Sequence, residues 1–248
     1  MCLRMRLWVI VCLKRTKFII RSRRINLLQN NLGCRGAQSL CSAAAIQTKN
    51  SRRNERLSAK VTDRRRKAFM KFLIASDIHG SKYYAEKVAE MFQAEEADQL
   101  VLLGDIYNHG PRNPLPKEYD PMGVAAVLNG LAEKLTVVKG NCDSDVDTLI
   151  SDFEFVSEAV IFDCGKKIFL QHGDRFCVDN LPKNCGNAFL YGHYHTGFIR
   201  RVGDLVVANC GSVSLPKGGT PNSYLILENA ELILKDIEGK EISRMKIE

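Results

Sequence analysis

Short apolar runs alternate with helix-like repeats between residues 70 and 140. Three apolar runs, each followed by polar residues or glycine, predict buried strands at residues 71–76, 99–103 and 135–139. Between them, residues 81–97 carry apolar side chains at helical spacing. A second helix is expected to begin at Pro121, because proline suits the first turn of a helix. This half therefore predicts the order strand, helix, strand, helix, strand.

Beyond residue 144 the pattern changes to short strands joined by tight turns. A short helix is expected near residues 145–151, ahead of these strands. The strands themselves are expected at residues 159–162, 167–171, 188–191, 198–202, 205–209, 223–228 and 231–236. Residues 104–120 are rich in glycine and proline and predict a long loop. Two packed sheets flanked by helices accommodate both halves, so the expected fold class is α/β.

Charge divides the chain near residue 69. Residues 1–69 contain 18 Lys and Arg but 2 Asp and Glu, whereas residues 70–248 contain 18 basic and 26 acidic residues. The net charge of +8 therefore belongs to the extension, and the remainder is acidic. An acidic domain argues against broad nucleic-acid binding, which needs clustered Lys and Arg to displace counterions from phosphates.

We interpret residues 1–69 as a basic extension outside the fold and residues 70–248 as one domain. The apolar run at residues 7–13 is far shorter than the ~20 residues of a membrane span, so no membrane association is expected. Three interpretations of the extension stay open: an upstream stretch included before a true start at Met70, an organellar transit peptide, or a disordered basic tail. The first is favoured because Met70 directly precedes the strand that opens a complete domain.

The cysteines indicate a reducing environment. There are nine, an odd number, and none forms a C-x-x-C pair, so neither a zinc knuckle nor a disulfide framework is expected. We therefore expect a cytoplasmic protein. The sequence leaves open whether it forms a homo-oligomer.

Polar side chains of metal-binding type follow five of the predicted strands. The segments are Asp77-Ile78-His79, Gly104-Asp105, Gly140-Asn141-Cys142-Asp143, Gln171-His172-Gly173-Asp174 and Gly192-His193-Tyr194-His195. Because strand ends of open α/β sheets converge at one edge, these side chains are expected to meet. Carboxylate, amide and imidazole groups together suit borderline divalent metals.

Each segment alone has a structural explanation. Asp77 could cap a helix, Asp105 could stabilise a turn, and the His193/His195 pair could lie on the surface. However, four of the five histidines follow glycine-punctuated apolar runs, in order with the acidic segments. The combination therefore favours a metal site.

The ordered set D-I-H, G-D, G-N-x-D, Q-H-G and G-H-Y-H resembles the calcineurin-like metallophosphoesterase superfamily. The longer segments S-D-I-H-G, L-G-D-I-Y-N-H-G-P-R-N, G-N-C-D-S and G-S-V-S-L-P-K-G-G are similar to its YfcE-type bacterial phosphodiesterases. The resemblance covers essentially all of residues 70–248. It implies a four-layer αββα sandwich of two mixed β-sheets flanked by helices. It also implies phosphodiester hydrolysis with two divalent ions, Mn²⁺ first, with Zn²⁺, Fe²⁺, Ni²⁺ or Mg²⁺ as alternatives.

The resemblance assigns seven ligand positions. By it, Asp77, His79 and His195 hold a first metal. Asn141, His172 and His193 hold a second, and Asp105 bridges both. Every position carries an acceptable ligand, which separates this chain from relatives that keep the fold as a protein-binding scaffold. The implied reaction is direct attack on phosphorus by a hydroxide that bridges the two metals.

Two positions depart from the superfamily pattern. In most of the superfamily a histidine at this position assists the leaving group. Here the position is Cys142, a cysteine as in the YfcE-type branch, and a thiol is a weaker acid catalyst than imidazole at neutral pH. Cys142 is thus either a poor acid or a packing residue, and Asp143 either supports the metal site or caps the following helix. Asp174 stands where relatives often have a second histidine. It could tune the second metal or merely end a strand. Asn141, Cys142 and Asp143 are the candidate catalytic residues.

The long loop supplies the candidate substrate contacts. Arg112 could bind a phosphate oxygen or tie the loop to the body, and His109 could hold the loop or contact substrate. Lys217 is a weaker candidate for phosphate binding. Alternative functions are a phosphomonoesterase or nucleotide pyrophosphatase with the same site, a non-catalytic scaffold, and an RNA-binding protein recruited by residues 1–69.

Overall fold

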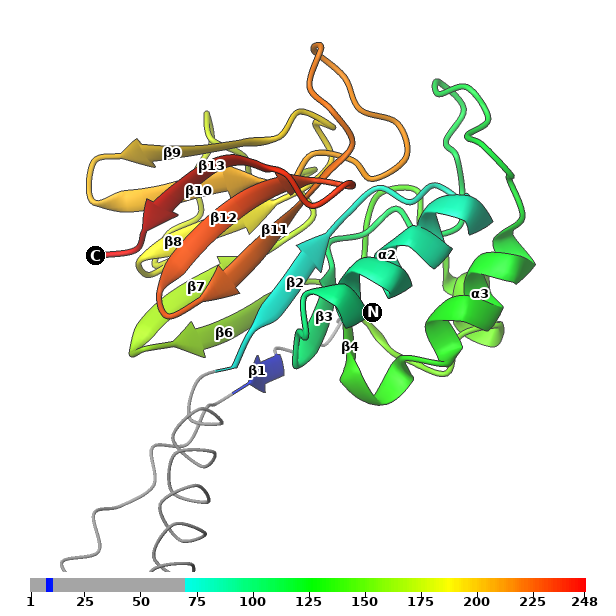
Figure 1. Ribbon diagram of the computed structural model, residues 1–248, viewed down its shortest axis with the longest axis horizontal. Coiled ribbons are helices and arrows are strands. Elements are labelled where there is room, and N and C mark those ends of the chain that lie inside the picture. Colours follow the sequence, from blue (N-terminus) through cyan, green and yellow to red (C-terminus); the bar gives the residue numbers. More distant parts are fainter. Residues whose placement is uncertain (1–7, 11–69) are drawn as a thin grey trace, which may run out of the picture. The chain divides into compact units, whose positions relative to one another are not determined.

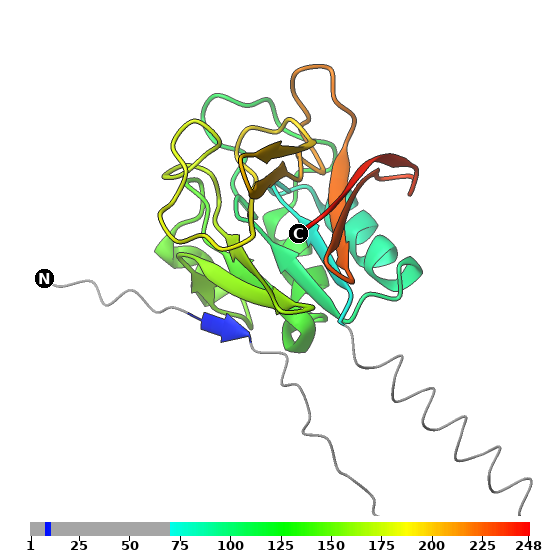
Figure 2. The ribbon, with the colours of Figure 1, turned by 90° about the vertical axis from the view of Figure 1, so that its left-hand side faces the viewer.

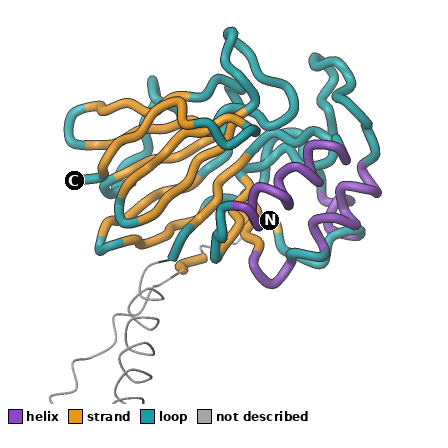
Figure 3. Tube along the Cα trace, viewed as in Figure 1, coloured by secondary structure: helices purple, strands orange, loops and turns teal. Residues whose placement is uncertain are grey.

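Two mixed β-sheets stack face to face in the computed structural model, which describes residues 8–10 and 70–248 (Figures 1 and 3). The strands of the first sheet are, in spatial order, β13 (Glu241–Lys246), β12 (Glu231–Asp236), β11 (Ser223–Glu228), β2 (Phe72–Ala75), β3 (Gln99–Leu102), β4 (Leu135–Val138) and β5 (Phe155–Val156). Those of the second are β1 (Trp8–Ile10), β6 (Ala159–Asp163), β7 (Lys166–Leu170), β8 (Ala188–Tyr191), β10 (Leu205–Asn209) and β9 (Phe198–Val202). This two-sheet architecture is the predicted one.

Strand β2 is the central strand of the first sheet and is buried on both faces. Successive side chains of a strand point to opposite sides of the sheet. Phe72 and Ile74 accordingly pack between the sheets, whereas Leu73 and Ala75 pack toward the helices. Burial on both faces explains why the sequence of β2 is a continuous apolar run rather than an alternating one.

Two α-helices cover the outer face of the first sheet (Figures 1 and 3). Helix α2 (Lys82–Ala94) is capped by Ser81, whose hydroxyl accepts a bond from the backbone N–H of Tyr84 at 3.3 Å. Helix α3 (Pro121–Asn129) is capped by Asp120 and has its proline in the first turn, as predicted. Such side-chain caps satisfy backbone N–H groups that have no partner within the helix.

The outer face of the second sheet is covered by a loop in the described part of the chain. Phe189 and Tyr191 of β8 pack there against Phe176, Val178 and Leu181, which belong to the segment between β7 and β8. The sheets, and the helices on the first sheet, therefore follow the prediction. The outermost layer on the second sheet consists of irregular backbone.

The structure adds elements that the sequence pattern did not predict. One such element is the 3-10 helix η1 (Ala132–Lys134). The 3-10 helix η2 (Asp145–Leu149), by contrast, occupies the position predicted for a short helix. Strands β5 and β13 were not predicted. Strand β1, from the extension that sequence analysis left out of the fold, pairs in parallel with β6. The predicted transit peptide, basic tail or upstream stretch otherwise lies outside the described residues.

Among the residues described, no helix combines the length and the apolar character that crossing a bilayer requires.

Candidate metal centre

The parallel strands β2, β3 and β4 end at the same edge of the first sheet. Their exits carry Asp77, Asp105 and Asn141, while β7 and β8, also parallel, lead to His172 and to the His193–His195 segment. The long loop after β3 and the loop between β10 and β11 rise from this end of the sandwich in both views (Figures 1 and 2). The fold thus delivers all seven predicted ligand positions to one place.

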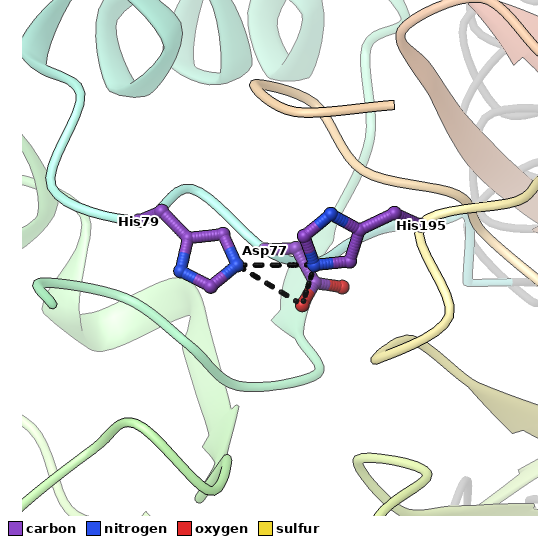
Figure 4. Close-up of side chains that lie close together, drawn as sticks. All are labelled: Asp77, His79 and His195. Atoms are coloured by element: carbon purple, nitrogen blue, oxygen red, sulfur yellow. Dashed lines mark hydrogen bonds and ion pairs between the residues drawn. The ribbon is translucent and has the colours of Figure 1, made fainter. Parts of the chain in front are cut away.

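Asp77, His79 and His195 form a first cluster (Figure 4). The Oδ1 atom of Asp77 lies 3.2 Å from Nε2 of His195 and 3.6 Å from Nε2 of His79. The two Nε2 atoms are 3.1 Å apart. All three side chains are buried.

His172, Asn141 and His193 form a second cluster beside the first. Nε2 of His172 lies 3.1 Å from Oδ1 of Asn141 and 3.1 Å from Nδ1 of His193. Asn141 is exposed and His193 is half-buried, so this side of the centre is open to solvent.

Asp105 lies between the clusters and presents one carboxylate oxygen to each. Its Oδ2 atom is 3.7 Å from Nε2 of His79, and its Oδ1 atom is 3.5 Å from Nε2 of His172. This carboxylate therefore joins the two groups of side chains.

Backbone carbonyls fix the tautomer of three of the histidine rings. The Nδ1 atoms of His79, His172 and His195 bond to the carbonyl oxygens of Asn108, Leu103 and Leu215 at 2.8, 2.6 and 2.6 Å. Because a carbonyl only accepts, each Nδ1 carries the hydrogen and the Nε2 of the neutral ring presents a lone pair to the centre.

The centre therefore gathers hydrogen-bond acceptors without matching donors. Oδ1 of Asp77 is buried and has no hydrogen-bond partner in the described residues. Nitrogen lone pairs and carboxylate oxygens at these separations repel one another unless a positive charge lies among them. The donor set, imidazole with carboxylate and amide oxygen, is one that borderline divalent cations bind. The residues present thus fit divalent metal ions.

The electrostatics agree with this fit. Burial alone would raise the pKa of the Asp77 carboxyl, but the adjacent rings of His195 and His79 hold that pKa well below its usual range. Burial also opposes protonation of His79 and His172, yet the carboxylates of Asp77 and Asp105 raise the pKa of both rings. Burial and the neighbouring His172 lower the pKa of His193. The carboxylates make the interior of the centre attractive to positive charge.

The backbone around the ligand positions adopts an uncommon conformation. Asp77, His79, Asp105, His193 and His195 have φ between 53° and 62°, in the left-handed region that non-glycine residues rarely occupy. Such outliers persist only where surrounding contacts over-determine them, and they cluster at functional sites.

Hydroxyl and amide donors hold Asp77 in this conformation. The side chains of Ser212 and Ser214 both donate to the backbone carbonyl of Asp77, at 2.8 and 2.7 Å. The backbone N–H of His193 donates to Oδ2 of the same residue at 3.0 Å, which leaves Oδ1 directed at the histidines. The predicted site did not include the two serines, although both belong to the G-S-V-S segment singled out in the sequence.

Asp143 supports Asp105 through the backbone. Its carboxylate accepts bonds from the N–H groups of Asp105, Ile106 and Gly140 at 2.9, 2.7 and 2.7 Å. The alternative that Asp143 caps the following helix is wrong, because Ser144 caps η2. Burial raises the pKa of the Asp143 carboxyl to about 6, and the three N–H groups oppose that rise.

Cys142 lies against Asp105 as well. Its backbone N–H donates to Oδ1 of Asp105 at 2.8 Å, and Nδ2 of Asn141 donates to its Sγ at 3.3 Å. Burial and the nearby Asp105 carboxylate raise the pKa of the thiol to about 12. A thiol with this pKa is a poor general acid at neutral pH.

The side chains of the other predicted residues belong to neither ligand cluster. Arg112 is exposed and forms no hydrogen bond or ion pair within the described residues, so it does not tie the loop to the body. His109 packs edge-on against the ring of Tyr119 at 5.3 Å. Asp174 is exposed and accepts a bond from Gln171 at 2.6 Å, and Lys217 is exposed.

Comparison with known proteins gives a consistent result. A family model described as calcineurin-like phosphoesterase superfamily domain matches residues 70–231. The chain is 45% identical over 163 residues to Phosphodiesterase YfcE of Escherichia coli K12, which covers 64% of this chain and 88% of that protein. It is 26% identical over 189 residues to the probable metallophosphoesterase YsnB of Bacillus subtilis, covering 71% and 97% of the two chains. The solved structure of the E. coli phosphoesterase Yfce matches with 40% identity and a TM-score of 0.69, over 72% of this chain and 100% of its own.

Proposed function

The chain belongs to the calcineurin-like phosphoesterase superfamily and is a metal-dependent phosphoric ester hydrolase, and we propose that it is a binuclear phosphodiesterase acting on small phosphate diesters. The diester preference is supported by the 45% identity to a protein named as a phosphodiesterase. The binuclear character is supported by the geometry of the centre.

The position of Asp105 is the observation that carries the proposal. One carboxylate with an oxygen toward each histidine cluster is suited to join two cations. In our assignment, Asp77, His79 and His195 hold the first cation and Asn141, His172 and His193 hold the second. Asp105 is a ligand of both.

Bound cations would supply a nucleophile at neutral pH and neutralise charge on the phosphoryl oxygens. The residues of this chain orient that chemistry. Carbonyl groups hold the rings of His79, His172 and His195, and Asp143 holds the backbone of Asp105. The phosphate group enters on the open side, beside Asn141 and His193. The raised pKa of Cys142 keeps its thiol protonated, so we assign it no acid role toward the leaving group.

The donor set is consistent with Mn²⁺ as the resident metal, with Zn²⁺, Fe²⁺, Ni²⁺ and Mg²⁺ as alternatives. Arg112 and His109 are proposed to contact the part of the substrate that extends toward the loop after β3. The described Cys142, Cys177, Cys185 and Cys210 form no disulfide, consistent with the proposed reducing, cytoplasmic location.

A paired substrate assay tests the proposal. The full chain, supplied with Mn²⁺, is offered bis(p-nitrophenyl) phosphate and, separately, p-nitrophenyl phosphate. The proposal predicts a higher kcat/KM for the diester and loss of both activities after chelation. Turnover of the monoester alone would contradict the diester preference. Tight metal binding without turnover of either ester would instead favour a scaffold.

A further inference from the structure

Cys142 belongs to a third group of metal-binding side chains that the seven ligand positions do not include. Its Sγ atom, a ring nitrogen of His79 and a carboxylate oxygen of Asp105 all lie within 4.8 Å of one another. A tetrahedral cation with sulfur and nitrogen ligands at about 2.0–2.3 Å holds its ligand atoms roughly 3.3–3.8 Å apart, so small side-chain movements would bring these three atoms to one ion. The thiol thus lies at the edge of the first cluster, on the side of Asp105.

The surrounding contacts hold the thiol in this position. The backbone N–H of Cys142 is bonded to Oδ1 of Asp105 at 2.8 Å, so the residue cannot move away without breaking a bond to the shared carboxylate. Asn141 donates to Sγ at 3.3 Å. On the other side, a Cβ atom at Gly110 would lie 3.0 Å from Sγ, which shows how closely the loop after β3 packs on the sulfur.

We propose that Sγ of Cys142 is a direct ligand for thiophilic divalent cations, such as Zn²⁺, Co²⁺ and Cd²⁺, held by His79 and Asp105. This inference rests on the metal site of the proposed function. When such a cation binds, the S–H bond breaks, the proton passes to solvent and the sulfur electron pair bonds to the metal. No oxidant or reductant is required. A hard cation such as Mn²⁺ leaves the thiol protonated, because thiolate ligands select soft metals.

The consequence is a site that distinguishes soft from hard cations. Without Cys142, the nitrogen and oxygen ligands alone determine the affinity. With it, soft cations gain a sulfur bond that Mn²⁺ does not use. Cys142 is therefore a selectivity residue for the metal, which accounts for a thiol at a position where imidazole would serve acid catalysis better.

Cobalt spectroscopy tests the proposal without relying on turnover. The full chain is prepared with Cys2, Cys12, Cys34 and Cys41 replaced by serine, so that thiols outside the described residues do not contribute. It is then compared with the same protein carrying Cys142→Ser, during titration with Co²⁺. We expect a near-ultraviolet sulfur-to-cobalt charge-transfer band that Cys142→Ser abolishes, while the visible cobalt bands remain and report that the ion is still bound.

Cys177→Ser in the same background is the matched control, since Cys177 is half-buried like Cys142 but belongs to no described metal-binding group. It should keep the charge-transfer band. Cys142→Ser should also weaken Zn²⁺ binding on the order of tenfold or more, because loss of even an indirect contact has that effect in metal sites. Mn²⁺ binding should be unchanged in the same variant. Visible cobalt bands without the charge-transfer band in the parent protein would overturn the proposal while sparing the metal site. Absence of any cobalt band would overturn both.

Discussion

The Nε2 atoms of His79 and His195 lie 3.1 Å apart while the opposite nitrogen of each ring is bonded to a backbone carbonyl. Both facing nitrogens therefore carry lone pairs in the neutral rings, and Oδ1 of Asp77 lies within 3.6 Å of each. Folding brings these acceptors together against their mutual repulsion, and a cation converts the repulsion into attraction. The centre is thus organised for metal by the fold itself.

Metal binding should accordingly stabilise the folded state. At a free Mn²⁺ concentration one hundred times its Kd, we expect the free energy of unfolding to rise by about 2.7 kcal/mol relative to chelated protein. Urea denaturation with and without Mn²⁺ measures this difference. The variant His195→Gln should show a much smaller gain. Equal midpoints for chelated and Mn²⁺-saturated wild-type protein would contradict the predicted linkage.

Asp105→Asn should remove the link between the two clusters. The amide keeps the shape of the side chain but has one acceptor oxygen and no charge, so it cannot serve two cations. We expect the metal content to fall and kcat/KM to fall on the order of 10²–10³-fold, as when one preorganised electrostatic group is lost. Elemental analysis and diester turnover check this. Asp98→Asn, at the opposite end of β3, is the control and should leave both unchanged. Wild-type metal content and activity in Asp105→Asn would refute the assignment.

Gly192→Ala should displace Asp77. An added Cβ would overlap Oγ of Ser76 and lie 2.7 Å from Oδ2 of Asp77, so one of these groups has to move. We expect weaker metal binding, and a loss of stability of about 1–3 kcal/mol. Gly130→Ala, at the end of α3 with a φ of −62°, is the matched control and should change stability by less than about 1 kcal/mol. Calorimetry of Mn²⁺ binding distinguishes the two variants. Equal Kd values for Gly192→Ala and Gly130→Ala would show that Asp77 is not displaced.

Glu95 gives a stability contribution whose pH dependence has a defined sign. Its side chain is 12% exposed and bonds to Lys235, Lys71 and Tyr224 at 2.6, 2.9 and 2.9 Å. Burial raises the pKa of this carboxyl, but the three donors outweigh burial and lower it from 4.5 to about 2. Because the folded pKa is below the unfolded value, the contribution is present above pH 4.5 and is lost as the pH falls toward 2.

The difference in unfolding free energy between wild type and Glu95→Gln should therefore be about 1–3 kcal/mol at neutral pH. This difference should shrink as the pH falls from about 5 toward the acid limit of folding, because Glu95 then becomes protonated in the unfolded chain and later in the folded one. Glu90→Gln, which breaks an exposed pair with Lys87, should cost less than about 1 kcal/mol throughout. A difference for Glu95→Gln that grows on acidification would contradict this account.

Hydrophobic periodicity and the order of the motifs predict most of the fold from the sequence. Apolar runs identified β2, β3 and β4 because these strands are buried, and Ser81 and Pro121 marked the starts of α2 and α3. The convergence of the motifs followed from one rule, that parallel strands end at the same edge.

The features that the sequence did not predict lack an apolar run or depend on backbone groups. Strand β13 is an edge strand whose side chains are mostly exposed, so it lacks an apolar run, and β5 has 2 residues. The carbonyls of Leu103, Asn108 and Leu215, which orient the histidines, are backbone groups present at every position of a chain. The role of Asp143 depends on three backbone N–H groups that only the tertiary fold brings together.

Anomalous X-ray diffraction from crystals of the full chain soaked with Mn²⁺ tests the central claim most directly. We predict two manganese peaks about 3.5–4 Å apart, one beside each histidine cluster, with a carboxylate oxygen of Asp105 on each. Peaks remote from Asp105, or a single peak at full Mn²⁺ saturation, would contradict the binuclear centre.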